Sequence, residues 1–251
     1  YIEIHKKCDE LIEKGIATLF QKSDNSFILS NILSYSYEGL KKTPKNFIGY
    51  SLITENNEEI STQEINGDNY CQVSLPPFSF TNFRKGNKQK PQTKKQSGFV
   101  LENELVQYNF SMDGTLTSAV DKKVNKNLLS APGNVLSLYE DRPLNWDAWD
   151  IDFYYRDSLL ETAKIEKINK VQNGPVLSLL EIHYNIGNSS IKQIISLSNR
   201  SKRLDFDTIV NWHEKHKMLR VHFPTNIVSE QASFDIQYGY VKRNTHKNTS
   251  W

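Results

Sequence analysis

The sequence predicts a mainly β protein with one helix near its N-terminal end. Apolar residues recur at three- and four-residue steps only at the start of the chain, a spacing typical of an amphipathic helix. From Ser26 onward, apolar and polar residues alternate in short runs that polar turns separate. Because no helical segments lie between these runs, we expect antiparallel strands in packed sheets rather than a parallel sheet covered by helices.

The first expected element is the amphipathic helix. Charged side chains of Glu10, Glu13 and Lys14 lie on its polar face. The residues of its apolar face are Cys8, Leu11, Ile12, Gly15, Ile16 and Leu19. A single amphipathic helix has nothing of its own to pack against, so this face needs another part of the protein.

The next expected body is a small β-sandwich. Three runs alternate with period two, namely Phe27–Leu33, Asn46–Thr54 and Tyr70–Leu75. Polar turns separate them, and Asn66 followed by Gly67 is typical of a two-residue hairpin. We therefore expect residues 25–97 to form the small sandwich.

A basic segment is expected to mark the end of this body. Arg84–Gly98 holds six basic residues and one proline, with no acidic and no aromatic residue, so it cannot contribute to a packed core. A nucleic-acid role would need aromatic rings among the cations for base stacking, and none are present. The composition therefore favours a solvated linker.

Residues 98–251 are expected to form part of a larger antiparallel sandwich. Alternate residues from Leu204 to Trp212 share one face, and Leu219, Val221 and Phe223 alternate again after the polar turn at Glu214–Lys217. Two alternating runs joined by a polar turn predict a long antiparallel hairpin.

Charge and cysteine usage exclude several classes of protein. The chain has 31 basic and 29 acidic residues and a formal net charge of +2, so no overall field favours nucleic acid or an anionic membrane. Cys8 and Cys71 lie in different expected elements without metal-ligand spacing, which favours a reducing compartment, and we expect the cytoplasm. No apolar run reaches the length of a membrane span.

The segment Asp141–Tyr155 is the strongest functional signal. It packs four aspartates and five aromatic rings into fifteen residues. Aromatic faces stack on the C–H side of a pyranose and carboxylates accept hydrogen bonds from hydroxyls, so the mixture favours a sugar-facing surface. The alternative is a buried tryptophan pair with aspartates that cap turns. The pocket candidates are Trp146, Asp147, Trp149 and Asp150, with Arg142 expected to orient the aspartates.

Together with Asn134–Asp141 before it, this segment resembles the non-catalytic β region of the retaining α-mannosidases of glycoside hydrolase family 38, in particular their cytosolic-type and bacterial branch. Four ordered blocks over roughly 150 residues are more specific than one motif. The first hundred residues match loosely. The three further blocks, in the same order, are Glu102–Ser118, Val210–His216 and Leu219–Arg243, which continues into Thr245–Trp251.

The resemblance implies a fold and a division of labour. Residues 1–24 would end a helical-bundle middle domain, and 98–251 would be the N-terminal, truncated part of a galactose mutarotase-like supersandwich. The nucleophile and the general acid would lie in a catalytic barrel missing from this chain, as would the ligands of zinc or another divalent metal. This chain would then contain no catalytic residue and no metal site. Its partners would be the barrel of the same polypeptide and a mannose-containing glycan, and the resemblance allows for a homo-oligomer.

Other candidate residues fit their chemistry poorly. His213 and His216 lie three apart in an expected turn, which is wrong for a helical zinc motif. The pairs Asp205 with Asp207, and Asp147 with Asp150, lack the opposed geometry that glycoside cleavage needs. Weaker pocket candidates, expected instead at an interface or on a strand face, are Arg220, His222 and Asn226.

These observations favour the post-barrel part of an α-mannosidase that removes terminal α-linked mannose, a part that supports the barrel, shapes the pocket and is inactive alone. Two alternatives stay open. A non-catalytic carbohydrate-binding β module would use the tryptophan segment as an exposed platform, whereas a structural interaction domain would use exposed sandwich edges.

Overall fold

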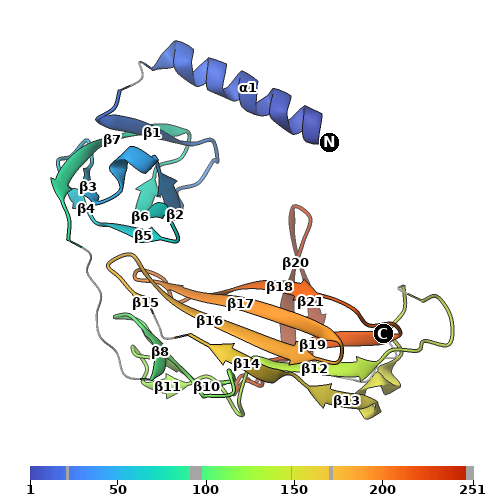
Figure 1. Cartoon of the computed structure of the whole chain (residues 1–251). Helices are drawn as coiled ribbons and strands as arrows, with labels where there is room; N and C mark the ends of the chain where they lie inside the picture. Colours follow the sequence, from blue (N-terminus) through green and yellow to red (C-terminus); the bar gives the residue numbers. More distant parts are fainter. Residues whose placement is uncertain (21–22, 91–97, 148, 170–171, 247–251) are drawn as a thin grey trace. The chain divides into compact units, whose positions relative to one another are not determined.

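A computed structural model describes residues 1–20, 23–90, 98–147, 149–169 and 172–246. The chain is mainly β, as predicted, with one α-helix and several antiparallel sheets (Figure 1). It divides into two compact units. The first comprises Tyr1–Gln96, Gln172–Leu179 and Leu197–Asn199, and the second comprises Ser97–Val171, Leu180–Ser196 and Arg200–Trp251. The domain limits that the resemblance implies, at residues 24 and 97, stay a prediction.

The first unit begins with the predicted helix, followed by two small sheets. None of the residues of α1 is buried, so its apolar face lies open in this chain. The strand order is β1-β7-β3-β4 in one sheet and β2-β6-β5 in the other. The element bounds are α1 Ile2–Leu19, β1 Ser26–Asn31, β2 Tyr37–Thr43, the 3-10 helix η1 Lys45–Phe47, β3 Tyr50–Ile53, β4 Glu59–Ile60, β5 Thr62–Ile65, β6 Asp68–Leu75 and β7 Ser79–Lys88.

Alternation along the strands builds the core of this unit. Every second residue of β6 from Asn69 to Leu75 is buried, as expected for a strand with one covered face. The buried core cluster is Phe47, Leu52, Cys71, Val73, Leu75 and Phe83. The Asn66-Gly67 turn is confirmed, because both residues have positive φ, 52° and 81°, and join β5 to β6 with Ile65 opposite Asp68.

The linker prediction is wrong for its first five residues. Arg84–Lys88 belongs to β7, where Arg84 pairs with Ser26 and Lys85 with Leu52. Strand pairing uses backbone groups, so charged side chains that point to solvent do not prevent it. Composition alone therefore does not reveal that these basic residues form part of a strand. Residues 91–97 of the expected linker lie outside the described residues.

Among its described residues, the regular elements of the second unit are strands and one 3-10 helix. Its strand orders are β11-β10-β9-β8, β13-β12-β19 and the pair β20-β21. A further sheet has the order β14-β16-β17-β18 with β15 beside β16, and of this sheet β15 and short ends of β16 and β17 belong to the first unit. The element bounds are β8 Phe99–Glu102, β9 Val106–Phe110, β10 Leu116–Asp121, β11 Lys126–Asn127, β12 Val135–Glu140, η2 Phe153–Asp157, β13 Leu159–Thr162, β14 Lys164–Ile168, β15 Gln172–Asn173, β16 Leu177–Ile186, β17 Ser189–Ser198, β18 Leu204–Asn211, β19 Lys217–His222, β20 Gln231–Ile236 and β21 Gly239–Asn244.

The predicted hairpin across residues 204–223 is wrong. β18 pairs with β17, whereas β19 pairs with β12 in another sheet, with Val135 opposite His222. The segment between them therefore crosses from one sheet to the other (Figure 1). Two alternating runs with a polar connection have the same pattern whether they pair with each other or with different strands.

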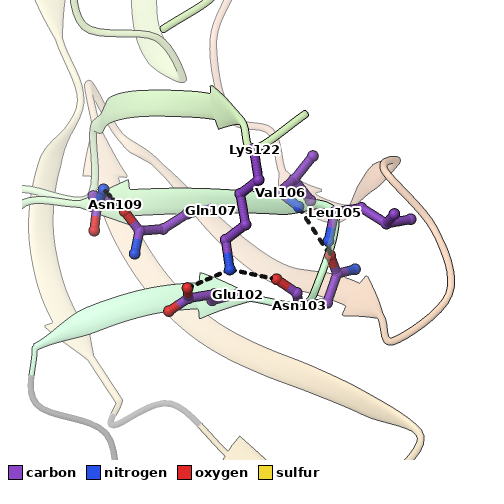
Figure 2. A network of polar contacts seen from close by, with 7 residues as sticks. All are labelled: Glu102, Asn103, Leu105, Val106, Gln107, Asn109 and Lys122. Atoms are coloured by element: carbon purple, nitrogen blue, oxygen red, sulfur yellow. Dashed lines mark hydrogen bonds and ion pairs between the residues drawn. The ribbon is translucent and has the colours of Figure 1, made fainter. Parts of the chain in front are cut away.

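A polar cluster fixes the hairpin of β8 and β9 at one end of this unit (Figure 2). The Asn103 side-chain oxygen accepts hydrogen bonds from the backbone N–H groups of Leu105 and Val106, at 2.8 and 3.0 Å. Lys122 Nζ donates to Glu102 Oε1 at 2.5 Å and to the Asn103 carbonyl at 2.6 Å. The Lys122 hydrogen bond lowers the pKa of Glu102. Side-chain bonds of this kind pin the turn and thereby the register.

A buried amide network positions the start of β12. Asn134 is 1% exposed, has a φ of 56°, and donates from Nδ2 to Gln193 Oε1 at 2.9 Å and to the Gly114 carbonyl at 3.2 Å. The Tyr184 hydroxyl also donates to that carbonyl, at 3.0 Å. A buried network with all its hydrogen bonds made specifies one arrangement. β12, which leads to the aspartate- and aromatic-rich segment, therefore starts at a fixed place.

The second unit should be sensitive to a methyl group at Gly114. This residue has a φ of 78°, and a Cβ atom there would collide with the Tyr184 ring. We expect Gly114→Ala to lower the free energy of unfolding by about 2–4 kcal/mol, from backbone strain plus overpacking. Urea unfolding followed by tryptophan fluorescence measures this.

The control is Gly98→Ala in the same unit. Gly98 has a φ of 75° but no neighbour within 4 Å of its Cβ position. In Gly98→Ala the free energy of unfolding should fall only by the contribution of backbone strain, about 1–2 kcal/mol. Equal losses in the two variants would contradict the packing role of Gly114.

The two thiols should differ sharply in reactivity. Cys71 is fully buried, and burial raises the pKa of its thiol to about 12, whereas Cys8 is exposed on α1. Because the thiolate is the reactive form, a thiol reagent at pH 8 should label one cysteine in the native protein and two in denaturant. Mass spectrometry counts the labels. Native Cys8→Ser protein should stay unlabelled, and rapid labelling of it would refute the burial of Cys71.

Candidate functional site

The aspartate- and aromatic-rich segment is the connection between β12 and β13, residues 141–158. Backbone hydrogen bonds close its base. Glu140 N–H donates to the Ser158 carbonyl at 3.0 Å, and Asp141 N–H donates to the His216 carbonyl at 2.8 Å. The connection therefore leaves and re-enters the sheet at fixed points, although it carries no strand of its own.

A tight turn forms the tip of this connection. Trp146 has a φ of 63°, which is uncommon for a residue with a bulky side chain. Its carbonyl accepts hydrogen bonds from the N–H groups of Trp149 and Asp150, at 2.9 and 3.0 Å. The turn brings together the four predicted pocket residues, Trp146, Asp147, Trp149 and Asp150.

The two tryptophans are exposed. Trp146 is 73% exposed and Trp149 is 87% exposed, so the alternative of a buried tryptophan pair is wrong. Further apolar side chains of the same connection also reach solvent, namely Leu144, Ile151 and Phe153. An exposed apolar surface of this extent is typical of a binding or contact region.

Asp152 holds the turn in place, a role that the sequence did not indicate. Its Oδ2 accepts a hydrogen bond from Leu144 N–H at 2.8 Å and one from the Tyr154 hydroxyl at 2.6 Å. The Tyr154 bond is the main cause, and the Leu144 bond the second, of the lowered pKa of Asp152, while the Asp152 carboxylate raises the pKa of Tyr154. One aspartate among four carried no signal that distinguished it from Asp147 or Asp150.

Arg142 does not orient the predicted aspartates. Its Nε lies 2.6 Å from Glu140 Oε1, at the base of the connection. The carboxylates of Asp147 and Asp150 accept no hydrogen bond from any residue that the structure describes. Because an arginine pairs with the nearest accessible carboxylate, the end of β12 provides its partner. The aspartates of the turn are therefore open to a ligand's hydroxyl groups.

A small hollow lies at the base of the connection. Its volume is about 70 Å³, well below the roughly 300–1,000 Å³ of ordinary ligand pockets. The exposed tip, by contrast, is shaped as a platform and not as an enclosed pocket. The residues that line the hollow are Glu140, Asp141, Arg142, Pro143, Asp152, Tyr154, Tyr155 and Ser158.

Two of the weaker candidates lie beside this connection. The Arg220 guanidinium is 4.9 Å from the centre of the Tyr155 ring, and His222 Nε2 lies 3.1 Å from the Tyr139 hydroxyl. Asn226 instead donates from Nδ2 to the Leu129 carbonyl at 2.7 Å, a bond that only stabilises the backbone.

The histidine pair and the strand aspartates have structural surroundings. Residues 212–216 are not helical, as expected, and His213 N–H donates to Ser189 Oγ at 2.8 Å. Asp205 pairs with Arg203 at 2.7 Å. Within the described ranges, no three His, Cys, Asp or Glu side chains lie close enough together to hold a metal ion. No helix in the same ranges combines the length and apolar character that a bilayer crossing requires.

Comparison with known proteins places this geometry in context. A model of the C-terminal domain of the glycosyl hydrolases family 38 matches residues 101–251. Alpha-mannosidase G of Dictyostelium discoideum is 34% identical over 237 residues, which cover 88% of this chain and 20% of that protein. Alpha-mannosidase 2C1 of Homo sapiens is 35% identical over 158 residues, 60% of this chain and 15% of that protein. The chain thus spans a fifth or less of the length of these relatives.

A solved structure shares the fold. The crystal structure of an alpha-mannosidase from Enterococcus faecalis V583 matches with a TM-score of 0.61 and covers 90% of this chain and 34% of that chain. The sequence identity is 16%, so this similarity concerns the fold alone.

Replacement of Asp152 should loosen the turn. Asp152→Asn removes the charge that the Leu144 N–H and the Tyr154 hydroxyl contact, so we expect the Leu144 amide to exchange its hydrogen about three- to tenfold faster. The pKa of Asp152 is lowered in the folded protein. Its protection of the Leu144 amide should therefore be complete above the ordinary aspartate pKa of about 3.9, and it should be lost as the pH falls through the lower pKa of the folded state.

Hydrogen exchange followed by mass spectrometry or NMR checks both effects. Asp150→Asn is the matched control, because its carboxylate accepts no hydrogen bond from a described residue, and its exchange should be unchanged. Equal effects of the two variants would contradict the role of Asp152.

Proposed function

Because this chain belongs to family 38 of the glycosyl hydrolases, with residues 101–251 in its C-terminal domain, we propose that it is the post-barrel part of a retaining α-mannosidase. The whole enzyme hydrolyses terminal α-linked mannose from glycans. In this proposal residues 1–24 end the helical-bundle middle domain, 25–97 form the small sandwich, and 98–251 are the first part of the large one. The catalytic barrel of the same polypeptide is the main partner.

The observation that carries the proposal is the exposed and braced turn at Trp146–Asp150. Indole faces suit the C–H side of a pyranose, and the unengaged carboxylates of Asp147 and Asp150 suit its hydroxyl groups. A turn with positive φ and two exposed tryptophans costs stability, and strained and exposed apolar segments of this kind are common at functional sites. The platform would complete a sugar pocket whose other walls belong to the barrel.

Chemistry is assigned to the barrel and not to this chain. Retaining cleavage needs a nucleophilic carboxylate and a carboxylic acid roughly 5–5.5 Å apart across the scissile bond. A divalent metal such as zinc, which would help to hold the sugar hydroxyls, would in this proposal also be held by the barrel. The chain alone is therefore proposed to be inactive.

The free thiols support the proposed compartment. Cys8 and Cys71 form no disulfide, as in most proteins of reducing compartments, so we assign the protein to the cytoplasm. A homo-oligomer is compatible with this proposal, whereas nucleic acid and membranes are not proposed as partners.

The second candidate function is a carbohydrate-binding β module. The exposure of Trp146 and Trp149 favours it, because an exposed aromatic platform can bind sugar without a barrel. The two functions differ in what the isolated chain does: a module binds mannosides alone, whereas the mannosidase part does not.

The tryptophans should contribute mainly to substrate binding. In the intact enzyme, Trp146→Ala and Trp149→Ala should each raise the KM for an aryl α-mannoside about three- to tenfold, with a smaller change in kcat, because stacking acts on the bound sugar. Tyr238→Ala is the control, since Tyr238 is another exposed aromatic residue, at the β20–β21 turn, and the KM of this variant should not change. Unchanged KM values in both tryptophan variants would refute the platform.

Residues 1–251 alone should neither hydrolyse the mannoside nor bind mannose at millimolar concentration. A colourimetric assay and ligand-observed NMR test these two statements. Turnover by the isolated chain would overturn the assignment of catalysis to the barrel, and mannose binding without turnover would favour the module.

A further inference from the structure

Strands β12 and β19 carry the basic side chains of Arg220 and His222 on one face, here called the cationic face, beside the connection at residues 141–158. Ser137 lies opposite Arg220 and Val135 lies opposite His222, and directly paired residues point to the same side of a sheet. Arg220, His222 and Tyr139 therefore share one face. Tyr139 is 8% exposed and its hydroxyl lies 3.1 Å from His222 Nε2, so these two side chains are joined by a hydrogen bond.

The ring of Tyr155, from η2, covers this face. It meets Tyr139 edge to face, with ring centres 5.4 Å apart. The Arg220 guanidinium lies 4.9 Å from the centre of the Tyr155 ring, and the Arg156 guanidinium lies 5.9 Å from the same centre. Two positive groups thus lie against one aromatic ring. The ring attracts each of them, and an anion bound beside both would offset their mutual repulsion.

In the described part of the chain no carboxylate lies within ion-pair distance of either guanidinium, although Glu140, Asp141 and Asp152 line the hollow that Tyr155 also lines. Arg142 and Arg203 each form an ion pair with a carboxylate, at 2.6 and 2.7 Å, whereas Arg156 and Arg220 form none. Arg220 is half-buried, and its guanidinium has five N–H donors. The contact with Tyr155 is a cation–π contact, so it leaves the N–H donors of Arg220 to solvent or to a ligand.

We propose that Arg220 and Arg156 bind an oxyanion, a phosphate or the phosphate group of a sugar phosphate. Arginine presents parallel N–H donors that match two oxygens of one phosphate. Tyr155 would hold the Arg220 guanidinium flat, and the Tyr139–His222 pair would support the same face from below. This site goes beyond the proposed mannosidase function, because it rests on the cationic face and neither on the barrel nor on sugar stacking.

The place of the site suggests its ligand. Tyr155 and Arg156 lie in the same connection as Trp146 and Trp149, so one loop carries both a sugar platform and an anion site. A phosphorylated mannose combines the two chemistries, whereas free phosphate uses only the second. The difference in their affinities distinguishes these two sources.

Titration of the intact protein tests the proposal. Isothermal titration calorimetry at low ionic strength with inorganic phosphate, mannose 6-phosphate and mannose should give saturable binding of both phosphates, independent of hydrolysis. Tighter binding of mannose 6-phosphate would identify a sugar phosphate as the ligand, and equal binding would identify the phosphate group alone. Absence of saturable binding of either phosphate would overturn the site.

Single variants locate the binding. Arg220→Gln should weaken phosphate binding about tenfold or more, and Arg156→Gln about threefold or more, because each removes charge-assisted hydrogen bonds. Arg203→Gln is the control and should bind as the parent does, since Arg203 is already paired with Asp205. Unchanged binding in both Arg156→Gln and Arg220→Gln would refute the assignment.

Two further variants guard against misfolding. Arg220→Lys keeps the charge and the packing but loses the forked geometry, so it should bind phosphate better than Arg220→Gln and less well than the parent. Arg156 is exposed, so its replacement should leave the fold intact and decides the outcome if Arg220→Gln does not fold. Binding by Arg220→Gln equal to that of Arg220→Lys would contradict a charge-dependent site.

Discussion

Strand β12 is covered on both faces, and the candidate site depends on this constraint. Leu136 and Leu138 are buried on one face, and Ser137 and Tyr139 are buried on the other. β12 lies between β13 and β19, and the register with β19 runs without a break from Val135 to Glu140. A slip of one residue would exchange the two faces and force the leucines into the places where Ser137 and Tyr139 pack, so the register is strongly specified. The ends of the connection 141–158 are therefore fixed as well.

This rigid base explains how an exposed aromatic turn can persist. Trp146 and Trp149 gain little from burial, and the positive φ of Trp146 adds strain. The Asp152 carboxylate offsets part of these costs through its bonds to the Leu144 N–H and the Tyr154 hydroxyl. Strain and exposed apolar surface in one short segment are common at functional sites, and the membership of family 38 makes a sugar the natural ligand to propose.

Local patterns predicted the elements whose contacts are close in sequence. The period of α1 and the Asn66-Gly67 hairpin each follow from a few neighbouring residues, and both were predicted correctly. Pairing over longer distances was not predictable in the same way. The alternation in β18 and β19 predicted one hairpin, yet these strands join different sheets. The composition of the basic residues of β7 predicted a linker, yet they pair with β1 and β3.

The sequence by itself determined the mainly β class, the family and the segment that carries the candidate site, because composition, periodicity and ordered blocks are properties of neighbouring residues. Tertiary structure alone decided that Arg142 pairs with Glu140, that Asp152 braces the turn, and that Arg220 and Arg156 meet at Tyr155. Each of these contacts depends on which side of a strand or turn a side chain points to. Register and loop closure set that direction, and both arise from hydrogen bonds between segments far apart in the chain.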